Sequence, residues 1–290
     1  MRMKSRLYTS LLIAASIACG CQGMEEISEM PVRFTASVQQ MSAAETDGTK
    51  GTLWNESGSD KPLSDYTNKF YVSVWNNVKG SSAIPTGTEV NYANDIWQPK
   101  SKYFWVENVE KTVFAYANTP ASGCGVLCNS KNNLSMTLVV PETADAQTDI
   151  LLGAYTGISD KGCADIHFVH PLTSVRFKKG VIAGGVAITR LSITKVAYSG
   201  NIKLYPDGSL SSWTVSDYDK SVSQSKESGL VAGDGSIGEP FLLIPQDLVE
   251  NPVRVVLELS DGNVVTTSLK SGKWLPGTAY TYTIDYDNPD

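Results

Sequence analysis

The alternation of apolar and polar residues at period two most constrains the fold of this chain. In residues 32–38 the apolar side chains Val32, Phe34, Ala36 and Val38 occupy every second position and so share one face of an extended strand. Turn residues interrupt the chain about every eight to twelve positions, and almost no segment has the spacing of an amphipathic helix. The pattern predicts an all-β protein.

The same pattern recurs along most of the chain. We expect two further early strands, at 70–75 and 112–116. A second series of expected strands runs through 164–170, 173–177, 187–198, 201–205, 240–244, 253–259, 264–269 and 280–286. Turns such as Asp207-Gly208 and Asp261-Gly262 supply the residues that tight hairpins require. Antiparallel meandering sheets are therefore expected.

The length of the chain indicates two domains. After a leader is removed, about 270 residues remain, which exceeds the usual size of a single hydrophobic core. Gly153, Gly157 and Gly162 interrupt the apolar pattern. We therefore expect domains at 21–160 and 161–290, and residues 41–68 are polar enough to predict a long exposed loop.

The first residues have the character of an export signal. Arg2, Lys4 and Arg6 precede an apolar run at 11–18, which is shorter than the roughly 20 residues needed to cross a bilayer. A cysteine directly after small residues resembles the bacterial lipobox, and Cys19 and Cys21 both fit this position, Cys19 somewhat better. We predict a signal peptide at 1–20 and a lipid anchor on one of these cysteines, the alternative being plain secretion.

Charge and cysteine content exclude two classes of protein. Loss of the leader removes three positive charges and moves the net charge from −6 to about −9. Because no basic cluster offsets this charge, we expect no nucleic-acid partner. The remaining cysteines Cys124, Cys128 and Cys163 are too few for a disulfide-stapled scaffold.

The same cysteines raise the question of a metal site. Cys124 and Cys128, with Cys163, His167 and His170, are residue types that bind zinc. On a strand, however, His167 and His170 point to opposite faces, and His170 is better explained as a structural histidine. We therefore predict no metal site.

Enzyme signatures are absent from the sequence. There is no Gly-x-Ser-x-Gly elbow, phosphate-binding loop or His-Glu-x-x-His motif, so we expect neither catalysis nor a cofactor. Trp75 and Trp105 lie in strand-like runs and are expected in the core. Trp54 and Trp213 lie in polar surroundings, where an exposed indole could stack on a sugar ring.

Four segments carry a family resemblance. Residues 149–152, 168–172, 241–246 and 274–282 follow one another in an order and spacing similar to those of fimbrillin lipoproteins, the Mfa-like, FimA-related family of Bacteroidales. The resemblance implies two tandem transthyretin-like β-sandwich domains. It also implies a surface-exposed subunit on the cell outer membrane or in the fimbrium, with other fimbrial subunits as partners and adhesion as its role. Pro245, which ends a strand, and the Pro276-Gly277 turn have plain structural explanations, so we expect these motifs to form core and turns.

The resemblance further implies assembly by strand exchange. In such fimbrillins a trypsin-like protease removes an N-terminal strand, and the open groove accepts a strand from a neighbouring subunit. Here the displaceable strand is the one that contains Val32, Phe34, Ala36 and Val38. The family usually has an arginine in the following loop, whereas this chain has Lys50, and Arg33 lies within the strand. Lys50 and Arg33 are therefore the candidate processing sites.

The position in a pilus stays open at this point. Little sequence follows the last expected strand, so no separate donor strand is evident. The sequence therefore fits an anchor, tip or accessory subunit, and it equally fits a stalk subunit whose residues 280–286 act as the donor strand. The alternative function is a monomeric surface lipoprotein that binds a glycan or a host protein on the loop at 41–68.

Overall fold

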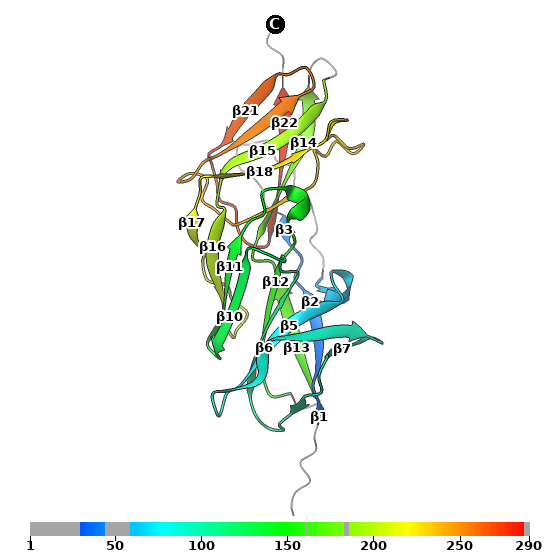
Figure 1. Cartoon of the computed structure of the whole chain (residues 1–290), viewed down its shortest axis with the longest axis vertical. Coiled ribbons are helices and arrows are strands. Elements are labelled where there is room, and N and C mark those ends of the chain that lie inside the picture. Colours follow the sequence, from blue (N-terminus) through cyan, green and yellow to red (C-terminus); the bar gives the residue numbers. More distant parts are fainter. Residues whose placement is uncertain (1–29, 44–58, 160–161, 183–185, 287–290) are drawn as a thin grey trace, which may run out of the picture.

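The computed structural model describes residues 30–43, 59–159, 162–182 and 186–286. The chain forms an elongated body of packed β-sheets (Figure 1), which confirms the all-β prediction. Apart from strands, the described residues contain two single-turn 3₁₀ segments, η1 (Leu63–Asp65) and η2 (Ala144–Ala146). Among these residues no helix is long and apolar enough to cross a membrane.

The lower half of the molecule in Figure 1 is built on one eight-stranded sheet. Its order is β13 (Cys163–Val169), β12 (Leu151–Gly157), β9 (Lys111–Ala117), β5 (Lys69–Asn76), β6 (Ser81–Ala93), β7 (Ile96–Pro99), β2 (Arg33–Val38) and β4 (Lys61–Pro62). Every pairing in this order is antiparallel, but β2 also pairs with β13 in parallel. That parallel ladder closes the sheet on itself.

The closed sheet encloses its own hydrophobic core. Phe70 and Phe168 are fully buried inside it with their ring centroids 5.5 Å apart, and Phe70 also lies 5.0 Å from Trp97. Strand β9 is buried on both faces, because Val113 and Ala115 point into this core while Phe114 joins a second core outside the sheet. A strand covered on both sides carries a nearly continuous apolar run, as β9 does from Val113 to Ala117.

Three four-stranded sheets lie above and beside the closed sheet, and β10 of the first reaches down beside β6 (Figure 1). The first follows the order β10 (Cys124–Ser130), β11 (Asn133–Val139), β16 (Ser199–Leu204) and β17 (Thr214–Asp217). The second follows β19 (Phe241–Leu243), β14 (Thr173–Ile182), β22 (Thr278–Tyr286) and β3 (Ser42–Ala43). The third follows β18 (Lys220–Ser225), β15 (Ile188–Val196), β20 (Val253–Leu259) and β21 (Val264–Leu269).

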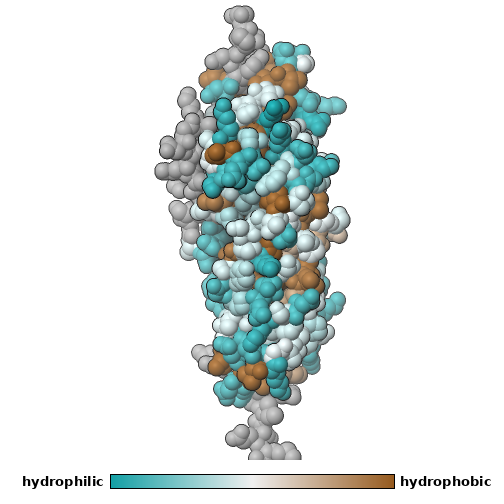
Figure 2. All heavy atoms as spheres, turned by 90° about the vertical axis from the view of Figure 1, so that its left-hand side faces the viewer, coloured by the Kyte–Doolittle hydropathy of each residue, from teal (hydrophilic) through white to brown (hydrophobic). Residues whose placement is uncertain are grey.

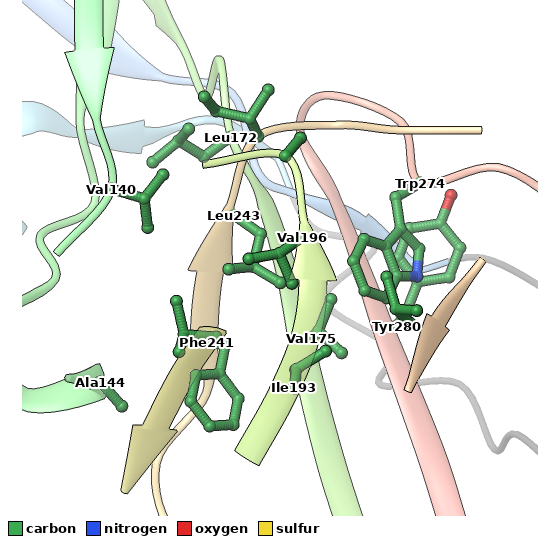
Figure 3. Close-up of a cluster of buried hydrophobic side chains, with 14 of the residues drawn as sticks. Val140, Ala144, Leu172, Val175, Ile193, Val196, Phe241, Leu243, Trp274 and Tyr280 are labelled. Carbon is green, nitrogen blue, oxygen red and sulfur yellow. The ribbon is translucent and has the colours of Figure 1, made fainter. Parts of the chain in front are cut away.

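These sheets pack around the second core, part of which Figure 3 shows. Trp274 is 1% exposed and its indole Nε1–H donates to the Tyr282 hydroxyl over 3.0 Å. The Tyr280 hydroxyl donates to the Lys273 carbonyl over 2.6 Å, and Pro276 and Gly277 form the turn between them. The closing motif is thus core and turn, as the sequence predicted.

Strand pairing crosses residue 160 in both directions. Strand β13, which follows that position, belongs to the lower sheet, whereas the β10–β11 hairpin, which precedes it, pairs with β16 over six residues from Leu134↔Leu204 to Val139↔Ser199. The two-domain division at residue 160 therefore stays a prediction, and the described strands do not divide cleanly there.

The predicted strands occur, but some strands were missed. Strand β6 contains Pro85 and Gly87, which read as loop residues in the sequence, yet it forms a long antiparallel partner of β5. The loop expected at 41–68 is wrong in part: Leu63 is fully buried, and Ser42 and Ala43 pair with β22. Residues 44–58 of that stretch lie outside the described residues.

Candidate functional site

The N-terminal segment, residues 30–43, is attached to three different parts of the molecule. At its start β1 (Met30–Pro31) pairs with β8 (Phe104–Trp105). In the middle β2 lies against β13, and at the end β3 pairs in parallel with the beginning of β22. The segment therefore runs along the lower half and reaches a sheet of the upper half, as Figure 1 shows for β1, β2 and β3.

Strand β2 is held unequally on its two sides. Its parallel ladder with β13 covers six residue pairs, from Arg33↔Cys163 to Val38↔Phe168. Toward β7 only the pair Phe34↔Trp97 is in register, and β4 covers the last two residues of the strand. The principal partner of β2 is thus β13, which lies about 130 residues later in the chain.

The inward face of β2 fills the core of the closed sheet. Phe34 and Val38, with Val32 just before the strand, are at most 3% exposed, and Ala36 is half-buried. The Phe34 ring meets Phe70 and Trp105 edge-on, with centroids 5.8 and 6.0 Å apart. Removal of β2 would expose this apolar groove.

The outward face of β2 carries weaker polar contacts. The exposed Thr35 hydroxyl donates to the Asp165 carboxylate over 2.6 Å, and the Ser37 hydroxyl lies 2.9 Å from the His167 Nδ1. Cys163 faces this side opposite Arg33, and burial raises the pKa of its thiol. Apolar packing inside, rather than these surface bonds, holds the strand.

The start of β2 is fixed by one glycine carbonyl. Gly162 O accepts hydrogen bonds from the Arg33 backbone N–H over 3.0 Å and from the Trp105 indole N–H over 2.8 Å. Gly162 has φ of +69°, and a Cβ atom there would lie 3.2 Å from Pro31 O. This close approach of backbone to backbone requires a glycine.

Beyond β2 the segment crosses to the upper half between two cavities. The Gln39 backbone N–H donates to Phe168 O, the Gln40 side chain donates to the Tyr66 hydroxyl, and the Ser42 N–H donates to Gly277 O. A cavity of about 440 Å³ is lined by Met41 on one side, and one of about 250 Å³ lies against residues 39, 40 and 42. The crossing is therefore hydrogen-bonded but incompletely packed.

The histidines and cysteines are dispersed. His170 is buried and its Nδ1 lies 2.9 Å from Asp149 Oδ1, whereas His167 is exposed, 3.5 Å from Asp165. Cys124 and Cys128 lie on β10, and both, like Cys163, are free thiols. Within the described ranges no group of three or more His, Cys, Asp or Glu residues could hold a metal ion.

The candidate processing and lipidation residues differ in what the structure describes. Arg33 has an exposed side chain, but its backbone is bonded into the β13 ladder, so a protease that requires an unpaired extended chain has no access while β2 is in place. Lys50, Cys19, Cys21 and Trp54 lie outside the described residues.

The tryptophans offer little for sugar stacking. Trp213 is half-buried and its indole N–H donates to Pro171 O over 2.9 Å. Trp105 is buried and Trp75 is half-buried, with its indole N–H 3.2 Å from the Cys128 sulfur. None of these three indoles lies free on the surface.

Sequence analysis missed the link between the N-terminal segment and β22. The pairs Ser42↔Thr278 and Ala43↔Ala279 join residues more than 230 positions apart, and a two-residue strand has no alternation to detect. The cavities on either side of residues 39–42 likewise have no sequence signal.

Comparison with known proteins places this geometry in a family. A model described as fimbrillin-like matches residues 62–289. Similar structures include a candidate cell adhesion protein from Bacteroides ovatus (14% identity, TM-score 0.64, covering 90% of this chain and 94% of that one) and another from Bacteroides uniformis (13%, 0.55, 90% and 94%). A fimbrial protein from Bacteroides vulgatus is similar at 15% identity and TM-score 0.52, covering 87% and 95%. No curated protein matches. Because the family model covers well over half of its residues, the chain belongs to the fimbrillin-like family.

Proposed function

We propose that this protein is a fimbrial subunit, exported as a lipoprotein, whose β2 groove accepts a strand donated by another subunit. Its fimbrillin-like membership supports a fimbrial or adhesin-like role at the cell surface, with other fimbrial subunits as partners. Its relatives by fold are fimbrial and adhesion proteins rather than enzymes. The lipid anchor in the outer membrane and the exchange of strands are the further parts of the proposal.

The observation that carries the proposal is the parallel pairing of β2 with β13. Among the pairings of the eight-stranded sheet it is the one that is parallel, and it joins segments far apart in the chain. Because β2 belongs to no hairpin with β13, it can leave without breaking a turn. Its departure would uncover six residues of β13 backbone and an apolar groove, the features that bind an added strand.

The geometry specifies the strand that would replace β2. It must run parallel to β13 and place apolar side chains at the positions of Val32, Phe34, Ala36 and Val38. The groove buries the positions of Val32, Phe34 and Val38 most fully. The position of Phe34 requires a large side chain, because Phe70 and Trp105 pack against its ring.

This chain is better suited to accept a strand than to donate β22. Tyr280, Tyr282 and Ile284 of β22 are buried, and the strand pairs with β14 over most of its length. Its removal would open the upper core. We therefore propose that the chain acts as an acceptor and that β22 stays in place.

Cleavage after Lys50 fits this arrangement better than cleavage after Arg33. Lys50 follows β3, so a cut there would leave residues 30–43 held by hydrogen bonds and packing alone, ready for displacement. A cut after Arg33 would require β2 to open first. We propose Lys50 as the processing site on this ground.

A disulfide lock tests the strand exchange. Arg33 pairs directly with the native Cys163, and adjacent strands lie within the Cα separation that a disulfide spans. In Arg33→Cys the oxidised chain should fail to form the heat-labile ladder of polymers in sheared surface material, and reduction should restore it. Arg33→Ser, the matched control, removes the same cation and should polymerise under both conditions. A full ladder from the oxidised Arg33→Cys chain would refute the exchange of β2.

A further inference from the structure

Four exposed apolar side chains gather at one end of the closed sheet. Phe104 is 46% exposed, Val106 53%, Ile158 48% and Val78 78%. We call these four residues the apolar cap. Figure 2 shows apolar residues at the lower end of the molecule.

The strand register places the cap residues together. Asn76 at the end of β5 pairs with Lys111 at the start of β9, which pairs in turn with Gly157 at the end of β12. The loops that carry Val78, Val106 and Ile158 therefore emerge from one end of the sheet. Phe104 lies at the same end, because it pairs with Pro31 of β1.

Hydrogen bonds hold these loops in position. The Lys111 ammonium donates to the carbonyls of Val106 and Val109 over 2.7 Å each, and the Lys131 ammonium donates to Asn77 O over 2.9 Å. The Tyr155 hydroxyl donates to Ile158 O over 3.3 Å. The cap residues are thus presented by braced loops.

The chain leaves the described structure at this same end. Met30 pairs with Trp105, the residue between Phe104 and Val106. From Met30 back to Cys21 or Cys19 there are nine or eleven residue steps, which reach at most about 40 Å when fully extended and about 20 Å as a flexible coil. A lipid on either cysteine would therefore hold this end, and not the opposite one, near a bilayer.

We infer that, before cleavage after Lys50 releases the N-terminal segment and its lipid, the apolar cap is a lipid-contact surface that docks the tethered chain end-on against the membrane. The inference rests on the lipoprotein export in the proposed function. Single apolar side chains on loops suit the interface between acyl chains and headgroups. The exposed Lys79 and Lys102 are offset by the exposed Glu107 and Glu110, so the contact rests on the apolar side chains rather than on net charge. Because the lipid already holds the protein at the bilayer, the cap meets the same bilayer at a high effective concentration, and a weak affinity of the cap is enough for contact.

Brominated lipids, which quench nearby tryptophan fluorescence, test the contact. The chain beginning at Cys21 is ligated through its N-terminal cysteine to a thioester lipid in phosphatidylcholine vesicles, which makes the test independent of lipidation in the cell. Phe104→Trp places a probe in the cap, and Val264→Trp, at an exposed position of β21 toward the opposite end, is its matched control. Bromolipids should quench the added fluorescence of Phe104→Trp at least twofold more than that of Val264→Trp.

A second variant separates the cap from the tether. Val106→Ser with Ile158→Ser, introduced beside Phe104→Trp, should abolish most of the quenching. Equal quenching of both probes, or quenching unchanged by the two serines, would overturn the inference, because the tether alone would then explain proximity. Absence of quenching with concentration-dependent dimerisation that the serines abolish would assign the cap to a second copy. Mass spectrometry of the native protein tests lipidation separately.

Discussion

Replacement of Phe34 by alanine should loosen β2 far more than it affects the rest of the protein. Phe34 is 3% exposed and makes two edge-on aromatic contacts. A buried Phe→Ala change costs about 3–5 kcal/mol, and aromatic pairs add about 0.5–1.5 kcal/mol beyond their buried area. We therefore expect Phe34→Ala to lower the free energy of opening of β2 by about 4 kcal/mol, which raises the population of the open strand about 1000-fold.

Hydrogen exchange followed by mass spectrometry measures this opening. Peptides from β2 and β13 should exchange up to about 1000-fold faster in Phe34→Ala, since the two strands protect each other's amides. Peptides from β20 should keep their rates. Thr35→Ala, the control on the same strand, loses one exposed hydrogen bond and should cost about 1 kcal/mol or less.

Two results would refute the reasoning. Equal acceleration in β13 and β20 would show that β2 does not open as a separate unit. Equal effects of Phe34→Ala and Thr35→Ala would show that the groove contributes little to holding the strand.

Two other positions give separate tests. Gly162→Ala should lower the denaturation midpoint more than Gly208→Ala. Both glycines have positive φ, which costs about 1–2 kcal/mol for alanine, but only at Gly162 would the Cβ atom crowd Pro31 O. Equal midpoints would contradict the role assigned to Gly162. Burial raises the pKa of Tyr282 to about 12; because the unfolded phenol ionises near 10, stability should fall as pH rises from about 10 to 12, and Tyr282→Phe should show a smaller fall in urea titrations at these pH values.

The strands most readily predicted from sequence are those with one buried face. Strand β20 alternates Val253, Val255 and Leu257 inward with polar or less buried residues outward. Strand β6 could not be recognised from alternation because Pro85 and Gly87 interrupt its pattern, although it pairs with β5 through local irregularities in register. Period-two reasoning therefore fails where a strand carries turn residues within it.

The sequence predicted one half of the candidate site, the buried face of β2, but not the strand that pairs with it. The alternation of β2 predicted which side chains would be buried, and Val32, Phe34 and Val38 are. Its partner could not be predicted, because pairing with β13 depends on how the intervening chain folds. The same holds for β11, whose pairing with β16 joins segments on either side of the expected domain boundary.

The direction of β2 has a mechanical consequence. The strand lies along the long axis of the molecule, with β1 at the lower end (Figure 1). Tension applied along this axis through the N-terminus would load the β2–β13 ladder in shear, so that its bonds resist together. A strand that invades from one end instead breaks those bonds one at a time. The β2–β13 ladder can thus resist tension along the axis and still be replaced, residue by residue, by an invading strand.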